Sequence, residues 1–213
     1  FATIGGGCRN TIEGTGWGTI GGGRLNYVGS TNAVIAGGRS NCIVFATAEN
    51  SFIGSGCDNI NSAGCGVIGG GEDNCNLGAW GVIAGGRQNS VNICYATISG
   101  GFNNEISGNG IHGSITGGCS GTITGCYSSI SSGQDNVVSG NRSFIAAGKD
   151  HCVTSSFGGI VAGCANCVES GCAVIVGEYN NHIAPDGNHG VILGGANNTI
   201  NDGVAGIVAS QAS

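Results

Sequence analysis

The sequence has little of what most soluble chains carry on their surfaces. Only 8% of its 213 residues are charged, 6% are aromatic, one is Pro and none is Met. Six Lys and Arg stand against twelve Asp and Glu, for a formal net charge of −6, which argues against a nucleic-acid partner because such partners need a basic surface. No apolar run approaches the roughly 18 residues of a membrane span, and no secretory signal is visible.

The same scarcities bear on the class of chain. Collagen is excluded because Gly does not occupy every third position and only one Pro is present. Disorder is disfavoured because 40% of the residues are hydrophobic and the Ile and Val residues are regularly spaced. The chain begins at Phe1 without a Met, so we expect a processed product or a segment of a longer protein, with residues 1–213 forming a single module.

What the sequence has in abundance is Gly, 46 residues in all, and a repeated phrase. Ile-Gly-Gly-Gly occurs at residues 4–7 and again at residues 20–23. An Ile or Val then recurs along the whole chain every 14 to 18 residues, most often 15, which marks a repeat architecture. The members of this first apolar column are Ile4, Ile20, Ile35, Ile53, Ile68, Ile83, Ile98, Ile115, Ile130, Ile145, Val161, Ile175, Ile192 and Val208.

Two further columns accompany the first. An Asn follows most of these residues by six positions, Gly121 and His151 take its place in two repeats, and Asn166 comes one residue early. A second apolar residue follows by eight positions in most repeats, but Asn61 and Asn76 interrupt that column. Because the two apolar columns lie about half a repeat apart, we assign each column to its own strand.

A unit of this length is too short for a helical repeat and fits two short strands with two turns. The sequence therefore predicts an all-β fold, a narrow two-sided parallel β-solenoid (β-roll) of about 14 coils of ~15 residues. The residues two before and two after each Ile are small. Since strand residues two apart share a face, we expect both to lie inward beside the Ile.

The Asn column is predicted to form a ladder of stacked amides that hydrogen-bond from coil to coil, a structural rather than a catalytic role. Its members are Asn10, Asn26, Asn41, Asn59, Asn74, Asn89, Asn104, Asn136, Asn166, Asn181 and Asn198.

The residue before each core Ile points outward by alternation, and most residues in that position are Val, Ile or Phe. An exposed apolar stripe of this kind typically marks an interface, although β-branched residues also simply favour strands. The hypothesis is lateral self-association through Val67, Val82, Phe144, Ile160 and Val174.

The twelve Cys residues do not follow zinc-ribbon spacing. Cys152 and Cys167 occupy one column in neighbouring coils, within disulfide range at ~4.8 Å. They form a disulfide in an oxidising environment or serve as small apolar fillers in a reducing one.

Two pairs of Asp residues, Asp58 with Asp73 and Asp135 with Asp150, would also stack on adjacent coils, where a cation such as Ca²⁺ could bridge the repelling charges. The alternative is a plain solvent-exposed turn. These weak Ca²⁺ candidates are Asp58, Asp73, Asp135 and Asp150. The four His residues are scattered, and no catalytic motif is present, so we expect neither a cofactor nor an enzyme.

The small–x–Ile–small–Gly phrase and the two-column coil resemble the head repeats of trimeric autotransporter adhesins of the YadA type, over essentially the whole chain. They are also similar to Gly-Gly-x-x-Asn repeat segments of bacterial, phage and large-virus surface or fibre proteins. The resemblance implies a left-handed parallel β-roll, trimeric assembly and adhesion. The chain departs from adhesin heads in its Gly-Gly and Asn residues and in its many Cys.

The leading functional hypothesis is a non-enzymatic structural or adhesive fibre or filament subunit, extracellular, on a cell surface or on a virion. Its expected partners are copies of itself, as a trimer or filament joined through the outer stripe or the open solenoid ends, and a host surface glycan or protein. The alternative is an ice-binding or carbohydrate-binding β-solenoid.

Overall fold

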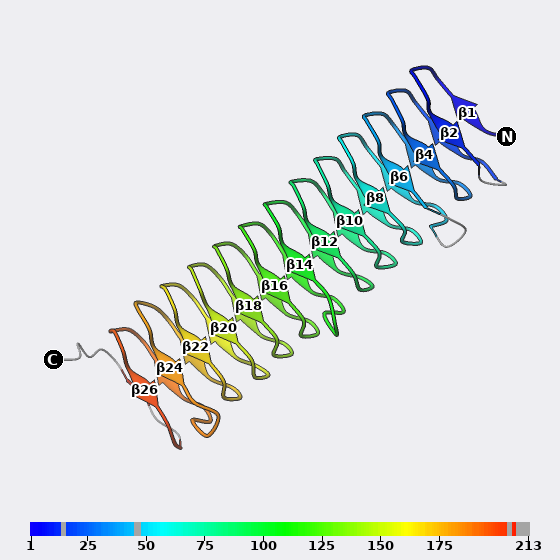
Figure 1. Cartoon of the computed structure of the whole chain (residues 1–213). Helices are drawn as coiled ribbons and strands as arrows, with labels where there is room; N and C mark the ends of the chain where they lie inside the picture. The colour runs from blue at the N-terminus through cyan, green and yellow to red at the C-terminus, as the bar shows by residue number, and fades with distance from the viewer. Residues whose placement is uncertain (14–15, 45–47, 204–205, 208–213) are drawn as a thin grey trace. The chain divides into compact units, whose positions relative to one another are not determined.

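A computed structural model describes residues 1–13, 16–44, 48–203 and 206–207 of the chain. These residues fall into two compact units, residues 1–105 and residues 106–213. In each unit the chain winds in coils, with one short strand on each of two parallel sheets and a turn at each edge (Figure 1).

In the first unit, the strands of the first apolar column are β1 (Thr3–Ile4), β3 (Thr19–Ile20), β5 (Val34–Ile35), β7 (Phe52–Ile53), β9 (Val67–Ile68), β11 (Val82–Ile83) and β13 (Thr97–Ile98). Those of the second column are β2 (Thr11–Ile12), β4 (Tyr27–Val28), β6 (Cys42–Ile43), β8 (Ile60–Asn61), β10 (Cys75–Asn76) and β12 (Ser90–Val91). Strand β14 (Glu105–Ile106) contains the boundary between the two units.

In the second unit, the first-column strands are β15 (Ser114–Ile115), β17 (Ser129–Ile130), β19 (Phe144–Ile145), β21 (Gly159–Ile160), β23 (Val174–Ile175), β25 (Val191–Ile192) and β27 (Gly206–Ile207). The second-column strands are β16 (Thr122–Ile123), β18 (Val137–Val138), β20 (Cys152–Val153), β22 (Cys167–Val168), β24 (His182–Ile183) and β26 (Thr199–Ile200).

Each strand has two residues, of which the first points outward and the second inward. In β11, Val82 is half-buried while Ile83 is fully buried between Ile68 and Ile98, its partners in the adjacent parallel strands. Because every coil repeats this register, the core is two facing columns of Ile and Val with no exposed surface in most coils. Burial of each such side chain contributes about 1.5–3 kcal/mol to stability.

The turn after each first-sheet strand requires backbone that few residues adopt. Gly86 has φ 89°, and a Cβ there would overlap the carbonyl oxygen of Gly101 in the next coil. Two residues later Gln88 has φ 57°, in the left-handed region. The Gly-rich phrase therefore serves turn geometry and the close approach of neighbouring coils.

The expectation about small residues is half right. Those two positions before the core Ile, such as Ala33, Ser51 and Ala96, are buried as predicted. Those two positions after it are not: Gly22 and Gly37 are only half-buried. The reason is that each strand ends at the core Ile, so alternation does not continue into the turn.

The predicted register is wrong in one coil. Ile160, not Val161, pairs with Ile145 and Ile175 and is fully buried, whereas Val161 is 37% exposed. With Ile160 in the core, Asn166 follows by six residues as in the other repeats, so its apparent irregularity disappears. Val208 lies outside the described residues, and Ile207 pairs with Ile192 in the core column.

The two interruptions of the second column lie in the core. Asn61 and Asn76 are fully buried, in register with each other and with Ile43 and Val91, while Ile60 beside them is 41% exposed. Strand alternation therefore holds even where the inward residue is polar.

The all-β, two-sided parallel β-solenoid with coils of ~15 residues is confirmed, and the described residues contain about 13 coils. The left-handed sense and the single module over residues 1–213 stay predictions. The described part of the chain has no helix of the length and apolarity needed to cross a membrane.

Candidate functional site

The predicted Asn residues form a hydrogen-bonded ladder inside the Gly-rich turns. Asn89 is representative: its Nδ2 donates to the Gly85 carbonyl at 3.1 Å and to the Gly101 carbonyl of the next coil at 3.0 Å. Its Oδ1 accepts the backbone N–H of Asn104 at 3.1 Å. Each amide thus closes its own turn and bonds the next coil, which is a structural role. The side chains from Asn26 to Asn198 in the ladder are buried, and Asn10 is half-buried.

His151 takes one place in this ladder. Its backbone N–H donates to Asn136 Oδ1 at 3.0 Å, and its Nδ1 accepts the backbone N–H of Asn166 at 3.1 Å. The bond to Nδ1 assigns the proton of the neutral ring to Nε2, which is buried without a well-formed hydrogen bond. Burial lowers the pKa of His151.

The outer face of the first sheet is less uniformly apolar than the sequence suggested. Val67, Val82 and Val174 are half-buried on this face, and Phe144 is 39% exposed there. Ile160 was wrongly assigned to it, since Ile160 is buried in the core. Because Ile160 is the inward residue of this coil, alternation makes Gly159 the outward one.

Phe144 occupies the space that Gly159 leaves open. A Cβ on Gly159 would overlap the Phe144 ring, which lies over the next coil. The Phe52 ring lies instead near Gly54 of its own coil. A Cβ built on Gly54 would stand 3.4 Å from Phe52 Cε1. The position of the Phe144 ring therefore requires Gly159, and both Phe rings add apolar surface to this face.

In the first unit this face carries an unbroken apolar run over four successive first-sheet strands. Val34, Phe52, Val67 and Val82 are paired in register along β5, β7, β9 and β11. In the second unit, Ser114, Ser129 and Gly159 interrupt the column. We define the apolar face as the side chains of Val34, Phe52, Val67 and Val82.

The four Asp residues occupy left-handed positions of the turns, with φ between 54° and 56°. Asp58 Oδ2 lies 3.2 Å from Arg39 Nη2, and Asp150 lies 3.8 Å from Lys149 Nζ. A hydrogen bond from Cys57 and the neighbouring Arg39 lower the pKa of Asp58. Among the described residues, no group of three candidate metal ligands includes Asp58, Asp73, Asp135 or Asp150.

Cys152 and Cys167 are direct partners in the second sheet, as their spacing suggested. Both thiols are free in the structure, and the disulfide stays a prediction for an oxidising environment. The interaction between the two neighbouring thiols lowers the pKa of Cys152 to about 7 and raises the pKa of Cys167 above its ordinary value.

A side-chain cluster surrounds Cys167 that the sequence analysis missed. His182 follows Cys167 in register on the next strand, and Glu169 lies two residues after Cys167. His182 Nε2 and Glu169 Oε2 are 3.0 Å apart, and one ligand atom from each of Cys167, Glu169 and His182 lies within 4.8 Å of the others. We call these residues, together with Cys152, the Cys–Glu–His cluster. The signal was available: Cys152, Cys167 and His182 are spaced 15 residues apart.

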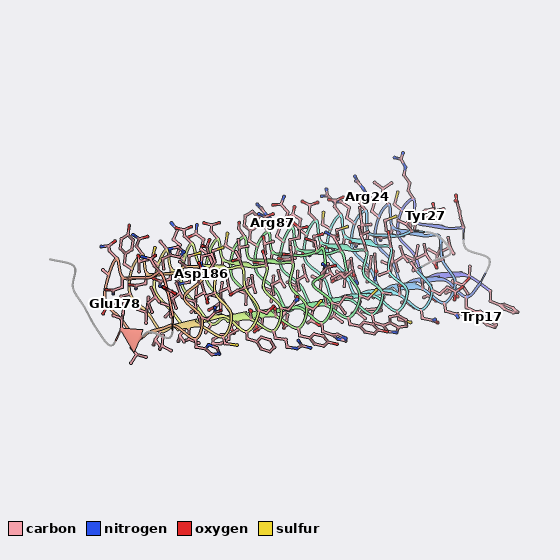
Figure 2. The ribbon with its side chains drawn as sticks, turned by 90° about the horizontal axis from the view of Figure 1, so that it is seen from below. Trp17, Arg24, Tyr27, Arg87, Glu178 and Asp186 are labelled. Carbon is pink, nitrogen blue, oxygen red and sulfur yellow. The ribbon has the colours of Figure 1, made fainter. Side chains whose placement is uncertain are left out.

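The turns after the second sheet carry exposed aromatic side chains, which the sequence analysis also missed. Trp80 and Tyr95 stack at 5.0 Å between centroids with an interplanar angle of 4°. In the second unit, the Arg142 guanidinium lies between Tyr127 and Phe157, 5.8 and 5.5 Å from their centroids. We call these side chains the aromatic edge. In the first unit Trp17 projects from one edge of the coils, while Arg24 and Arg87 project from the other (Figure 2).

Taken together, the coils, the Asn ladder and the side chains repeated in register define a β-solenoid repeat protein whose chemical features lie on its surface. The described residues enclose no pocket. The chain matched no protein-family model and no curated protein sequence in the two comparisons made.

Proposed function

We propose that the chain is a non-enzymatic structural or adhesive module that associates with copies of itself. The observation that supports this most is the apolar face of the first unit, where the outward residues of four successive strands are all apolar and stand in register. An apolar stripe gains about 25 cal/mol for each Å² that it buries against a partner, and its regular spacing suits an identical copy.

A second contact surface is the first coil. Ile4 is 46% exposed, whereas Ile20 of the next coil is fully buried. A further coil stacked on β1, from whatever source, would bury Ile4 and pair its open strand edge. The proposed assembly, trimer or filament, uses one or both of these surfaces, with an extracellular, cell-surface or virion-surface location and a host glycan or protein as an adhesion target.

The test is the mass of the assembly, measured by analytical ultracentrifugation over a range of concentrations. Val34→Asp with Val82→Asp places two charges on the apolar face, on coils that are not adjacent. We expect this double variant to shift the mass to that of a monomer or of an end-to-end assembly alone. The matched control is Cys42→Asp with Ser90→Asp, on the outer face of the second sheet in the same coils, which should leave the mass unchanged. A wild-type protein that stays monomeric at all concentrations would contradict the proposal.

A carbohydrate-binding role is the second candidate, because the aromatic edge exposes Trp80 by 53% and Tyr127 by 59%. The stacking of Trp80 on Tyr95 covers one face of each ring, which reduces the ring-face area on which a sugar could stack. Soluble oligosaccharides that change tryptophan fluorescence in the wild type but not in Trp80→Ala would favour this role. An ice-binding role has less support, since the outer column of the first sheet mixes Thr19 with Val34 and Phe52.

A further inference from the structure

The second sheet of the second unit carries a group of side chains with the chemistry of a metal site. Strands β20, β22 and β24 are adjacent and in register, so Cys152, Cys167 and His182 form one outward column. Glu169 stands beside Cys167 and reaches His182. Two thiols, an imidazole and a carboxylate are the ligand types that Zn²⁺ takes in proteins.

We infer that the Cys–Glu–His cluster is a binding site for a single Zn²⁺ ion, with Cys167, Glu169 and His182 as primary ligands and Cys152 as the fourth.

The separations suit a tetrahedral ion. Two ligand atoms bound about 2.0 Å from Zn²⁺ at the tetrahedral angle lie roughly 3.3 Å apart, and His182 Nε2 and Glu169 Oε2 are 3.0 Å apart. The Cys167 sulfur completes a triangle in which all the separations are within 4.8 Å. Small side-chain rotations therefore suffice to bring the three atoms around one ion.

Cys152 is placed to close the fourth position. It is the partner of Cys167 on the adjacent parallel strand. Its sulfur is outside the group of three ligand atoms that lie within 4.8 Å of one another, so its side chain must rotate toward the ion; two sulfurs bound to one Zn²⁺ at about 2.3 Å lie roughly 3.8 Å apart. The rigid parallel register holds the sulfurs on one face and leaves both half-buried. Two thiolates beside an imidazole favour Zn²⁺ over the hard cations Ca²⁺ and Mg²⁺, which take oxygen ligands.

Metal binding and a disulfide exclude each other at this place, because a sulfur in a Cys152–Cys167 bond is no longer a thiolate. The bound ion would link β20, β22 and β24 across three successive coils. This inference does not depend on the proposed self-association.

The experiment uses the full chain, reduced and freed of metal, and titrates it with Co²⁺ as a spectroscopic stand-in for Zn²⁺. We expect one equivalent to give the visible bands of tetrahedral cobalt and a near-ultraviolet sulfur-to-metal charge-transfer band, both abolished by added Zn²⁺. Cys167→Ser and His182→Gln should weaken binding by more than the roughly 10–100-fold cost of losing an outer partner. Cys152→Ser should weaken binding and reduce the charge-transfer intensity.

Two matched controls lie in the same unit. Cys172→Ser changes an exposed thiol five residues after Cys167, and His189→Gln changes an exposed imidazole in a turn; both should bind as the wild type does. A second measurement uses the wild-type chain. Zn²⁺ should protect Cys152 and Cys167, but not Cys172, from alkylation detected by mass spectrometry. No tetrahedral cobalt spectrum, equal loss in the control variants, or unprotected Cys152 and Cys167 would overturn the inference. A Cys152→Ser spectrum of unchanged intensity would remove Cys152 from the ligand set and overturn the four-ligand site.

Discussion

Asn166 donates its backbone N–H to Nδ1 of His151 at 3.1 Å, so an imidazole stands in a column whose other members, apart from Gly121, are Asn residues. The bond needs the Nδ1 lone pair, because a backbone N–H can only donate. Protonation of Nδ1 would set two donors against each other inside a buried turn.

Stability should therefore fall as the pH falls. Burial lowers the pKa of His151 below its ordinary value of 6.5, so the unfolded chain takes up the proton first. The contribution of His151 to stability is fully present well above pH 6.5 and is lost as the pH falls below that value. The free energy of unfolding, measured by denaturant titration between about pH 8 and pH 5, should fall more steeply for the wild type than for His151→Asn. The exposed His189→Asn serves as the control and should keep the wild-type slope; equal slopes in all three proteins would refute the prediction.

Removing an amide from the middle of the ladder should be costly. Asn89→Ala takes away the acceptor of the Asn104 backbone N–H and the donor to the Gly85 carbonyl. A buried polar group left without a partner costs about 1–3 kcal/mol, so we expect a loss of at least about 2 kcal/mol in the free energy of unfolding.

The matched variant is Asn10→Ala, which removes the same kind of amide, including the acceptor of the Asn26 backbone N–H, at a half-buried position that water reaches more easily. Its cost should stay below about 1 kcal/mol. Equal losses for Asn89→Ala and Asn10→Ala in denaturant titrations would mean that burial of the ladder is not what makes it stabilising.

Replacing Asn76 by Val should raise stability. Asn76 is fully buried, and its Oδ1 has no hydrogen-bond partner. Its Nδ2 donates to the Gly81 carbonyl at 2.8 Å, but that carbonyl also accepts the backbone N–H of Val67 at 3.0 Å and would keep a partner. We expect a gain of about 1 kcal/mol in the free energy of unfolding.

Asn61→Val is the comparison for this change. The Oδ1 of Asn61 accepts the backbone N–H of Ala63 at 3.2 Å, and its Nδ2 donates to the Gly66 carbonyl at 2.8 Å. Because both ends of this amide are bonded, its replacement should gain less than that of Asn76. A greater gain in the free energy of unfolding for Asn61→Val than for Asn76→Val would contradict the explanation from the unbonded Oδ1 of Asn76.

Phe144 and Gly159 should be energetically coupled. Gly159→Val alone places a side chain where the Phe144 ring lies, and overpacking of this kind costs about 1–3 kcal/mol. Phe144→Val together with Gly159→Val recreates the Val67–Val82 pair of the first unit and should recover most of the loss. The double-mutant cycle should give a coupling of about 1 kcal/mol. Additive effects of the two substitutions would show that the Phe144 ring moves aside freely.

The coils and their two sheets could be predicted from sequence because each coil repeats the same apolar residues at the same spacing, which sets the strand register. Ile83 predicts the burial of Ile98 by spacing alone, and parallel pairing then repeats every environment. The failure at Ile160 has a physical origin. Ile160 and Val161 are adjacent and equally apolar, so only the spacing to Asn166 or to Ile175 distinguishes them.

The surface chemistry was harder to predict, because it depends on side chains that touch across coils. The spacing placed Cys152 beside Cys167, yet the approach of Glu169 to His182 depends on side-chain rotamers. The same holds for the ring of Phe144, which lies over Gly159 rather than over its own coil. A sequence repeat predicts which residues stack in register from coil to coil. Contacts between side chains at different positions of the repeat depend on their rotamers, which only the three-dimensional structure gives.

The constant eight-residue step from the first apolar column to the second has a consequence for inheritance. From Ile83 to Val91 the chain passes through the Gly86 turn and Asn89. The backbone N–H groups that donate to an acceptor in a neighbouring coil are those of Ala84, Arg87, Gln88, Asn89 and Ser90. A gene rearrangement that duplicates or deletes one complete coil leaves all these partners matched. A loss of a single codon within the step turns the following side chains to the opposite face. Tandem copies of this chain should therefore vary in length by whole coils, and partial coils should be eliminated by selection.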